Sequence, residues 1–160
     1  MPMNTHTGPT VYAPREDSEM LAEAARRFSE GNILDMGCGS GICGLAASEN
    51  PAVVRVTFAD INPDALACAQ KNAAEEKVRK PMKFSQTDLF SNVPGTFDTI
   101  LFNPPYVPTD AGEKTGGRLE KALDGGPDGR GVLDRFLAEL DAHLNANGTL
   151  LLLNSSRSAP

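Results

Sequence analysis

The chain has 160 residues, a length that corresponds to one domain with its own hydrophobic core. Hydrophobic residues make up 40% and charged residues 22%, near the ordinary usage of globular proteins, so extensive disorder is excluded. The 15 Lys and Arg residues against 21 Asp and Glu residues give a net charge of -6. This sign disfavours a protein that binds nucleic acid through phosphate contacts.

No apolar run reaches the length of about 18 residues that a membrane-spanning helix needs. The start of the chain lacks the pattern of a secretory signal, so a cytoplasmic protein is expected. Cys38, Cys43 and Cys68 are odd in number, unlike a disulfide framework, and we expect reduced thiols. A metal site is not expected, because no CxxC motif occurs and His6 and His143 lie far from the cysteines in the sequence.

One domain is expected over residues 1–160, with disorder over residues 1–10. Behind Pro14, apolar residues recur at helical spacing from Met20 to Phe28 and predict a first helix. The further expected elements are, in order, strand 32–36, helix 41–47, strand 53–60, helix 64–76 behind Asn62 and Pro63, strands 82–86 and 97–102, helix 131–144 and strand 149–153.

This alternation of strands and helices predicts an α/β fold that is Rossmann-like, with a mostly parallel sheet and helices on both faces. In such folds ligands bind at the carboxyl ends of the strands, so function is to be sought in the turns that follow them. Residues 107–131 are rich in glycine and charge. A connection of this length is unusual in a compact domain and predicts a functional loop on the substrate side. The alternative is a solvated connector without a role in the site.

The first motif is a glycine-rich turn after the first expected strand. Gly37, Gly39 and Gly41 leave backbone N–H groups accessible to a bound molecule, and Asp60 ends the next strand, where it can accept the hydroxyl protons of a ribose. The GxGxG spacing and the preceding Asp35 argue against a pyrophosphate and for a nucleoside cofactor with an ammonium group. S-adenosylmethionine is such a cofactor. The alternative is a tight turn that only caps a helix.

The second motif is Asn103-Pro104-Pro105-Tyr106, directly after a strand. Two consecutive prolines fix an extended backbone, so the Asn103 side chain and the Pro104 carbonyl can face one point. These two acceptors match the two protons of a planar –NH₂ group, and the Tyr106 ring can cover its plane. Catalysis would then rest on positioning and electrostatics. The alternative is a loop that the prolines merely stiffen.

These motifs carry a resemblance to a known family. The chain resembles the class I S-adenosylmethionine-dependent methyltransferases over residues 33–41, 60–63, 87–89 and 102–106. Residues 11–18 and 124–131 resemble a narrower family, the HemK-type protein-glutamine N5-methyltransferases. The resemblance is strongest to the short archaeal and eukaryotic branch of that family. The resemblance covers residues 11–155 and implies a Rossmann-like methyltransferase domain.

The resemblance implies methylation of the glutamine side-chain amide in the GGQ motif of a peptide-chain release factor. Asp35 and Gly37 would meet the methionine part of the cofactor, and Asp88 its adenine amino group. The implied cofactor-binding residues are Ser18, Asp35, Gly37, Gly39, Gly41, Asp60, Ile61, Asp88, Leu89 and Asn103. The implied catalytic residues are Asn103, Pro104, Pro105 and Tyr106. For Asp17 and Ser18 the alternative is a helix N-cap, and for Asp88 it is the mere end of a strand.

Family members continue with a helix and a final strand, so the carboxyl edge of the sheet is expected to be incomplete. The chain also begins almost directly at the expected core, whereas the bacterial branch carries an N-terminal helical substrate domain. Docking of a release factor would then use the core or a partner. In the short branch the resemblance implies a small zinc-binding activator protein over the outer strand 82–86.

Two other functions remain open at this point. Methylation of adenine N6 or another nucleobase amine suits the same –NH₂ geometry, although the acidic charge disfavours it. A truncated, non-catalytic module that only binds S-adenosylmethionine is the third possibility. Titration with the cofactor separates this module from the two enzymes, and parallel assays with a release factor and an oligonucleotide separate the enzymes from each other.

Overall fold

A five-stranded parallel sheet, in the order β3-β2-β1-β4-β5, forms the centre of the computed structural model, which describes residues 5–104 and 130–154. The elements are α1 (Glu16–Phe28), β1 (Gly31–Met36), α2 (Ile42–Ser48), β2 (Val53–Asp60), α3 (Pro63–Glu75), β3 (Met82–Gln86), β4 (Phe97–Phe102), α5 (Gly131–Glu139), the 3-10 helix η2 (Leu140–Ala142) and β5 (Leu144–Leu152). The predicted α/β fold with a parallel sheet is confirmed.

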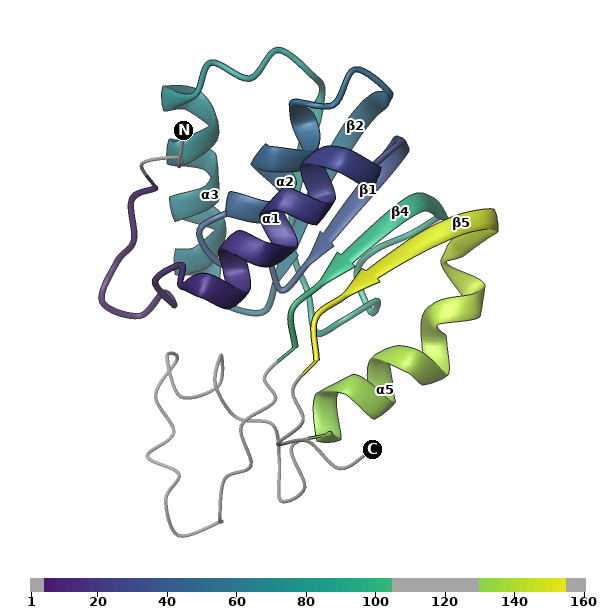
Figure 1. The fold of residues 1–160 in the computed structure, drawn as a ribbon. Coiled ribbons are helices and arrows are strands. Elements are labelled where there is room, and N and C mark those ends of the chain that lie inside the picture. Colours follow the sequence, from purple (N-terminus) through teal and green to yellow (C-terminus); the bar gives the residue numbers. More distant parts are fainter. Residues whose placement is uncertain (1–4, 105–129, 155–160) are drawn as a thin grey trace, which may run out of the picture.

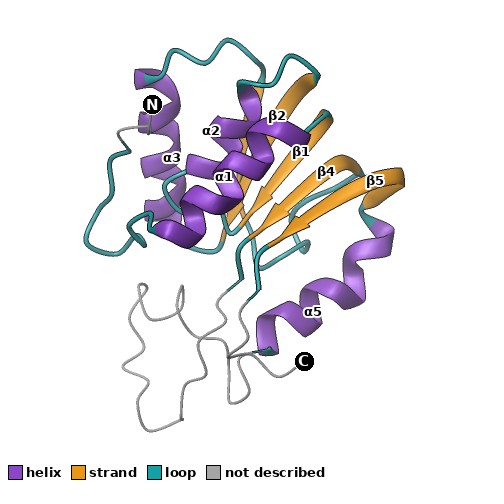
Figure 2. Ribbon diagram, in the orientation of Figure 1, coloured by secondary structure: helices purple, strands orange, loops and turns teal. Residues whose placement is uncertain are grey.

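Helices cover both faces of the sheet, as Figures 1 and 2 show: α1, α2 and α3 lie on one face and α5 lies on the other. The alternation of side chains along each strand separates the core into two parts. Ile33 and Phe58 pack toward α1–α3, and Phe58 stacks on Phe84 with ring centroids 5.0 Å apart. Leu34 packs on the α5 side, where Phe136 is fully buried.

The strand order reverses between β1 and β4, which are neighbours in space although two strands separate them in the chain. Excursions from these two strands leave the sheet in opposite directions, and this opens a crevice at their carboxyl ends where ligands bind in doubly wound folds. The register pairs Asp35 with Leu101 and Met36 with Phe102. The two predicted motifs therefore follow adjacent strands at the same edge of the sheet.

The end of the described chain differs from the prediction. The sequence predicted a helix over 131–144 and a strand only from Thr149, whereas α5 ends at Glu139 and β5 already begins at Leu144. A register shift lies between the pairs Phe97–Leu144 and Thr99–Thr149, and Asn147 has a positive φ of 65°. The strand thus contains a bulge built on an Asn-Gly pair, which reads as a loop in the sequence.

Disorder is predicted over residues 1–10, of which residues 1–4 lie outside the described residues, whereas residues 6–10 contact α3 and its N-cap. The backbone N–H of His6 donates to Asn72 Oδ1 at 2.8 Å, and the His6 carbonyl accepts from Asn72 Nδ2 at 3.0 Å. The Thr10 hydroxyl donates to the Asp64 carboxylate at 2.7 Å. The Thr10 carbonyl accepts from Asn62 at 2.9 Å. Residues 6–10 therefore form a strap along α3, held by polar side chains of that helix and its N-cap. We call these residues the N-terminal strap.

Within residues 5–104 and 130–154 no helix is long and apolar enough to cross a membrane. The expected substrate-side loop 107–131 lies outside the described residues except for its last two positions, and the same holds for Pro105 and Tyr106. The expectation that the carboxyl edge of the sheet is incomplete stays a prediction, as does the cytoplasmic location.

Candidate functional site

The glycine-rich turn after β1 has a backbone that only glycine adopts without strain. Gly37, Gly39 and Gly41 have φ values of 64°, 54° and 87°. A Cβ atom at Gly39 would meet no atom within 4 Å, whereas one at Gly41 would lie 3.0 Å from the Cβ of Ala69. Gly41 thus allows α2 to approach α3, and Gly39 leaves open space at the carboxyl end of the sheet.

Asp35 lies beneath this turn with only 3% of its surface exposed. Its Oδ2 atom accepts a hydrogen bond of 2.8 Å from the backbone N–H of Gly44. Burial raises the pKa of the Asp35 carboxyl to about 8, against the opposing effect of this hydrogen bond. A side chain at Gly44 has no room, because its Cβ would lie 2.5 Å from the Phe58 ring and 2.9 Å from the Asp35 carboxyl oxygen. The site therefore holds a buried acid whose ionised form a nearby cation would favour.

Asp60 ends β2 and fixes the turn from the other side. Its two carboxyl oxygens accept one hydrogen bond each, both 2.9 Å long, from the backbone N–H groups of Gly39 and Asn62. Burial raises the pKa of Asp60, and these backbone N–H groups oppose the rise. Each oxygen keeps a lone pair for a further donor. Ile61 follows with 49% of its surface exposed, an apolar side chain beside these acceptors.

The turn after β3 brings Asp88 and Leu89 to the same edge. The N–H of Thr87 donates to the carbonyl of Asp60 at 3.0 Å, which joins this turn to the end of β2. Leu89 is buried and has a positive φ of 50°, and its carbonyl accepts from the Thr87 hydroxyl at 2.7 Å. Asp88 forms a salt bridge of 2.9 Å with Arg135 of α5. The adenine role of Asp88 stays a prediction.

Asn103 follows β4 beside the glycine turn. Its Nδ2 atom faces the Asp17 carboxylate at 3.5 Å. Its Oδ1 atom is buried and has no hydrogen-bond partner among the described residues. A buried amide oxygen without a donor is uncommon in folded proteins and marks a position that a ligand can complete. Pro104 is fully buried behind it.

Asp17 and Ser18 lie inside the first turn of α1, so the alternative that they form its N-cap is wrong. The N-cap residue is Arg15, which makes no side-chain capping bond. Asp17 Oδ1 accepts from the Ser18 N–H at 2.8 Å instead. Ser18 is buried, and its carbonyl faces the Cys43 thiol at 3.7 Å. A cofactor contact of Ser18 stays a prediction.

Asn72 is a residue of this site that the sequence analysis missed. It is 1% exposed, and its Nδ2 atom donates to the carbonyl of Ser40 in the glycine turn at 2.9 Å as well as to the N-terminal strap. The sequence did contain a signal for this residue, because Asn72 continues the helical spacing of the buried residues Ala65 and Ala69 in α3. A polar residue on an otherwise apolar helix face needs partners. Here those partners are the turn and the strap.

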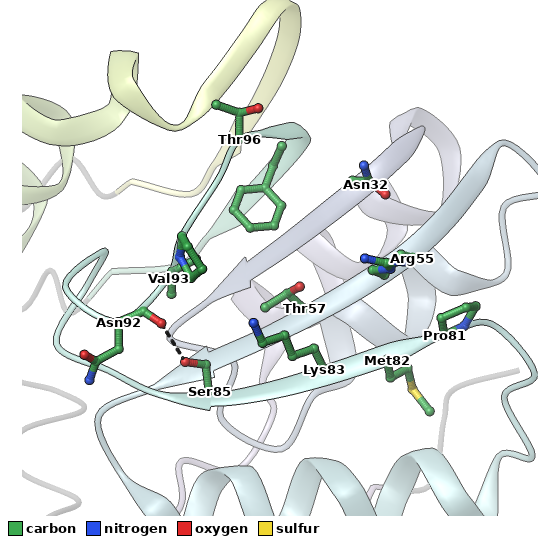
Figure 3. Close-up of a pocket in the computed structure, with 12 residues that line it drawn as sticks. Asn32, Arg55, Thr57, Pro81, Met82, Lys83, Ser85, Asn92, Val93 and Thr96 are labelled. Carbon is green, nitrogen blue, oxygen red and sulfur yellow. Dashed lines mark hydrogen bonds between the residues drawn. The ribbon is translucent and has the colours of Figure 1, made fainter.

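A second hollow lies away from these residues. A cleft of about 390 Å³ lies across β1, β2 and β3 and is bounded by residues 92–94 and 96–97 (Figure 3). It is on the α5 side of the sheet, because Asn32 shares a face of β1 with Leu34. The exposed cations Arg55 and Lys83 line it, and neither forms a salt bridge within the described part of the chain. No residue predicted for the site lines this cleft.

The side chains at the carboxyl edge of the sheet offer acceptors for different parts of one ligand arrangement. Asp35 offers a buried carboxyl for a cation, Asp60 offers acceptor lone pairs for neighbouring hydroxyls, and Asn103 offers an unused amide oxygen. Within the described residues no group of three or more His, Cys, Asp or Glu side chains could hold a metal ion. The arrangement can bind a cationic nucleoside and a planar –NH₂ group side by side.

Comparison with known proteins gives matches over most of the chain. Residues 4–122 match the family model described as "Methyltransferase small domain". A protein of Methanocaldococcus jannaschii with the provisional name of a protein N5-glutamine methyltransferase is 42% identical over 148 residues, which cover 92% of this chain and 74% of that protein. The release factor glutamine methyltransferase of Deinococcus radiodurans is 34% identical and matches 94% of this chain and 56% of its own length. This chain therefore spans about half of the Deinococcus protein.

Solved structures support the fold. A methyltransferase from Pyrococcus furiosus superposes with a TM-score of 0.66 and 21% sequence identity, over 94% of this chain and 68% of that chain. At this identity the likeness concerns the backbone arrangement alone.

Proposed function

Because the chain belongs to the methyltransferase small domain family and, within it, to the protein-glutamine N5-methyltransferases, we propose that it transfers a methyl group from S-adenosylmethionine to a glutamine side-chain amide of a protein. The observation that carries this proposal is the buried Oδ1 atom of Asn103 at the carboxyl end of β4, which has no partner within residues 5–104 and 130–154. An amide –NH₂ is the donor that this oxygen lacks. The acceptor nitrogen would sit beside the glycine turn that follows the adjacent strand β1.

The residues present fit the cofactor. Asp35 would face its ammonium group, Asp60 would accept from the ribose hydroxyls, and the open space at Gly39 leaves room for its chain. Ile61 and Leu89 would contact the adenine ring, with Asp88 at its amino group. Ser18 would lie near the methionine part. When bound, S-adenosylmethionine supplies an electrophilic methyl group on a sulfonium.

The chain's own contribution would be position and electrostatics. Asn103 Oδ1 would accept one proton of the acceptor –NH₂, and the Pro104 carbonyl would accept the other. Two such hydrogen bonds fix the plane of the amide and increase the electron density on its nitrogen. Pro105 and Tyr106, outside the described residues, stay predictions for the remainder of this contact. No strong base is required, because the surplus proton of the methylated amide can pass to solvent.

The acceptor that the relatives favour is a peptide-chain release factor, at the glutamine of its GGQ motif. The Deinococcus relative is named a release factor glutamine methyltransferase, and the GGQ glutamine is what the sequence resemblance implies. The test is mass spectrometry of a release factor after incubation with the protein and S-adenosylmethionine, with a GGQ-to-GGN release factor and an oligonucleotide in parallel. A single added methyl on the GGQ glutamine supports the proposal. Methylation of the oligonucleotide alone would overturn it in favour of a nucleobase acceptor.

A small zinc-binding activator is proposed as a partner at the edge strand β3. Met82 and Phe84 are half-buried on this edge, and the exposed cations Lys83 and Arg55 line the adjoining cleft (Figure 3). Unpaired edge strands are ready sites for pairing with another chain. An acidic surface on the activator would complement the two cations.

We expect Lys83→Glu to weaken the complex with a co-expressed activator by about tenfold, because an attractive charge becomes repulsive. Titration calorimetry of the purified proteins measures this. Lys71→Glu is the matched control, since Lys71 is an exposed cation of α3 on the far side of the sheet. Equal effects of both substitutions, or full activity of the protein alone with no complex formed, would contradict the proposed partner.

The raised pKa of Asp35 predicts a pH dependence of cofactor binding. At a pH below its pKa of about 8, the Asp35 carboxyl is protonated in the free protein. The ammonium group of the cofactor favours the ionised carboxylate. Binding should therefore release a proton. We expect the affinity to rise by up to about tenfold per pH unit between pH 5 and pH 7. Calorimetry in two buffers with different ionisation enthalpies counts the protons released.

The raised pKa of Asp35 also makes the stability of the free protein depend on pH, with the opposite sign to the cofactor affinity. The unfolded carboxyl ionises near its ordinary pKa of 3.8, whereas the folded one keeps its proton to about 8. The folded state thus binds one more proton in this window, and the free energy of unfolding should fall as pH rises through it. Asp35→Asn should remove both slopes. Unchanged slopes in that variant would show that another group titrates.

A further inference from the structure

The side-chain amide of Asn103 has two ends of nearly equal size and opposite chemistry. Only its oxygen can accept a proton from the acceptor –NH₂, whereas its own –NH₂ would present donors to donors. A rotation of about 180° around the last side-chain bond exchanges the two ends, and this torsion has broad, roughly two-fold preferences. Productive binding therefore requires a group that selects one orientation.

Asp17 is placed to make that selection. Its Oδ2 atom lies 3.5 Å from Asn103 Nδ2, across 86 residues of sequence. An ionised carboxylate has no proton to donate and can only accept. The reverse orientation of Asn103 would bring the amide oxygen against this carboxylate, with two acceptors facing each other. The orientation with Oδ1 turned away from Asp17 is thereby favoured, and this is the atom that has no partner in the described part of the chain.

Asp17 is itself held in place from two directions. The N–H of Ser18 donates to its Oδ1 atom at 2.8 Å. The Tyr12 hydroxyl faces both carboxylate oxygens at 3.4 and 3.5 Å. Burial and the charge of Asp17 raise the pKa of Tyr12, which keeps this hydroxyl protonated as a donor. The carboxylate therefore has a defined position at the start of α1.

We propose that Asp17 is a positioning residue, which orients the Asn103 amide so that its oxygen stays available to the nitrogen that receives the methyl group. This inference rests on the proposed function for the identity of the acceptor. It concerns a contact within the chain, however, and can be examined without any acceptor.

Asp17→Asn is the most selective test, because it keeps the size of the side chain and lets either end of the Asn103 amide bind. We expect kcat to fall by about tenfold, while the Kd for S-adenosylmethionine stays within about twofold. Tyr12→Phe, which removes a hydroxyl that faces the Asp17 carboxylate, should lower kcat by a smaller factor. Both are measured with the acceptor at saturation, so that KM and kcat are separated.

The matched controls are Glu16→Gln and Glu19→Gln. Each also removes one negative charge from the first turn of α1, and both side chains are exposed. A role of Asp17 limited to the stability of that helix predicts the same small change in melting temperature for all three variants and no selective fall in kcat. That result would overturn the proposal, as would a rise in the Kd for the cofactor that accounts for the whole loss of activity.

A second readout needs no acceptor. The side-chain –NH₂ signals of Asn103 in a ¹⁵N correlation spectrum are identified by their disappearance in Asn103→Asp. They should shift in Asp17→Asn and stay in place in Glu16→Gln. If they do not move in Asp17→Asn, the orienting contact is absent and the inference fails. If they move while the unaltered protein methylates no acceptor, the contact stands and the proposed function fails.

Discussion

Asn103→Ala is expected to lower kcat for glutamine methylation by about 10²–10³-fold and to leave the Kd for S-adenosylmethionine within about twofold. The substitution removes a buried oxygen that has no partner among the described residues, so no internal hydrogen bond of that atom is lost. The contact of Asn103 Nδ2 with Asp17 at 3.5 Å is lost as well, but the main effect should fall on the acceptor nitrogen, which is no longer held in the plane that transfer requires.

Single-turnover kinetics with saturating acceptor, combined with calorimetry of the cofactor, measure the two quantities separately. Asn145→Ala is a matched control at the other end of the sheet, where Asn145 Nδ2 donates to Asp98 at 2.9 Å. It also removes an asparagine amide, but far from the site. Equal rates for Asn103→Ala and the unaltered protein would remove Asn103 from the reaction.

Asp60→Ala is expected to raise the Kd for S-adenosylmethionine by about 10²-fold, the effect of two lost hydrogen bonds to a charged acceptor. The substitution also frees the backbone N–H groups of Gly39 and Asn62, each held by Asp60 at 2.9 Å. The glycine turn should loosen, which adds to the loss of affinity. Calorimetry with the cofactor gives the Kd directly.

Asp98→Ala separates these effects from a general loss of stability. Asp98 accepts a backbone hydrogen bond of 2.7 Å from Asn32 and one from Asn145, so it resembles Asp60 in its partners but not in its place. Its removal should lower the melting temperature without changing the Kd. A Kd for Asp60→Ala that equals that of the unaltered protein would exclude Asp60 from ribose binding.

The placement of the main motifs could be predicted from the sequence, and the membership of the methyltransferase family is confirmed. Short apolar runs rich in β-branched residues identify buried strands, and parallel strands with intervening helices bring their carboxyl ends to one edge. Asp35, Asp60 and Asn103 come directly at or after such ends, so their proximity follows from the topology. The glycine positions followed from the same argument, since only glycine adopts their positive φ freely.

Contacts between distant side chains could not be predicted in this way. Arg135 reaches Asp88 across 47 residues and Asp17 reaches Asn103 across 86. Local periodicity carries no information about such pairs, because they depend on helix placement and side-chain torsions that tertiary packing decides. The early start of β5 was missed for a related reason, since an Asn-Gly bulge has the local signature of a turn.

The N-terminal strap has a consequence for the order of events during synthesis. His6 and Thr10 are synthesised before their partners Asn72 and Asp64, which follow 66 and 54 residues later in the chain. At about 5–20 residues per second, His6 waits roughly 3 to 13 s for its partner. The carbonyl of Ser40 also lacks its hydrogen bond until Asn72 has been synthesised. A nascent chain that ends before α3 thus presents a glycine turn without the support of Asn72, and the turn is held in place only when the N-terminal strap and α3 meet.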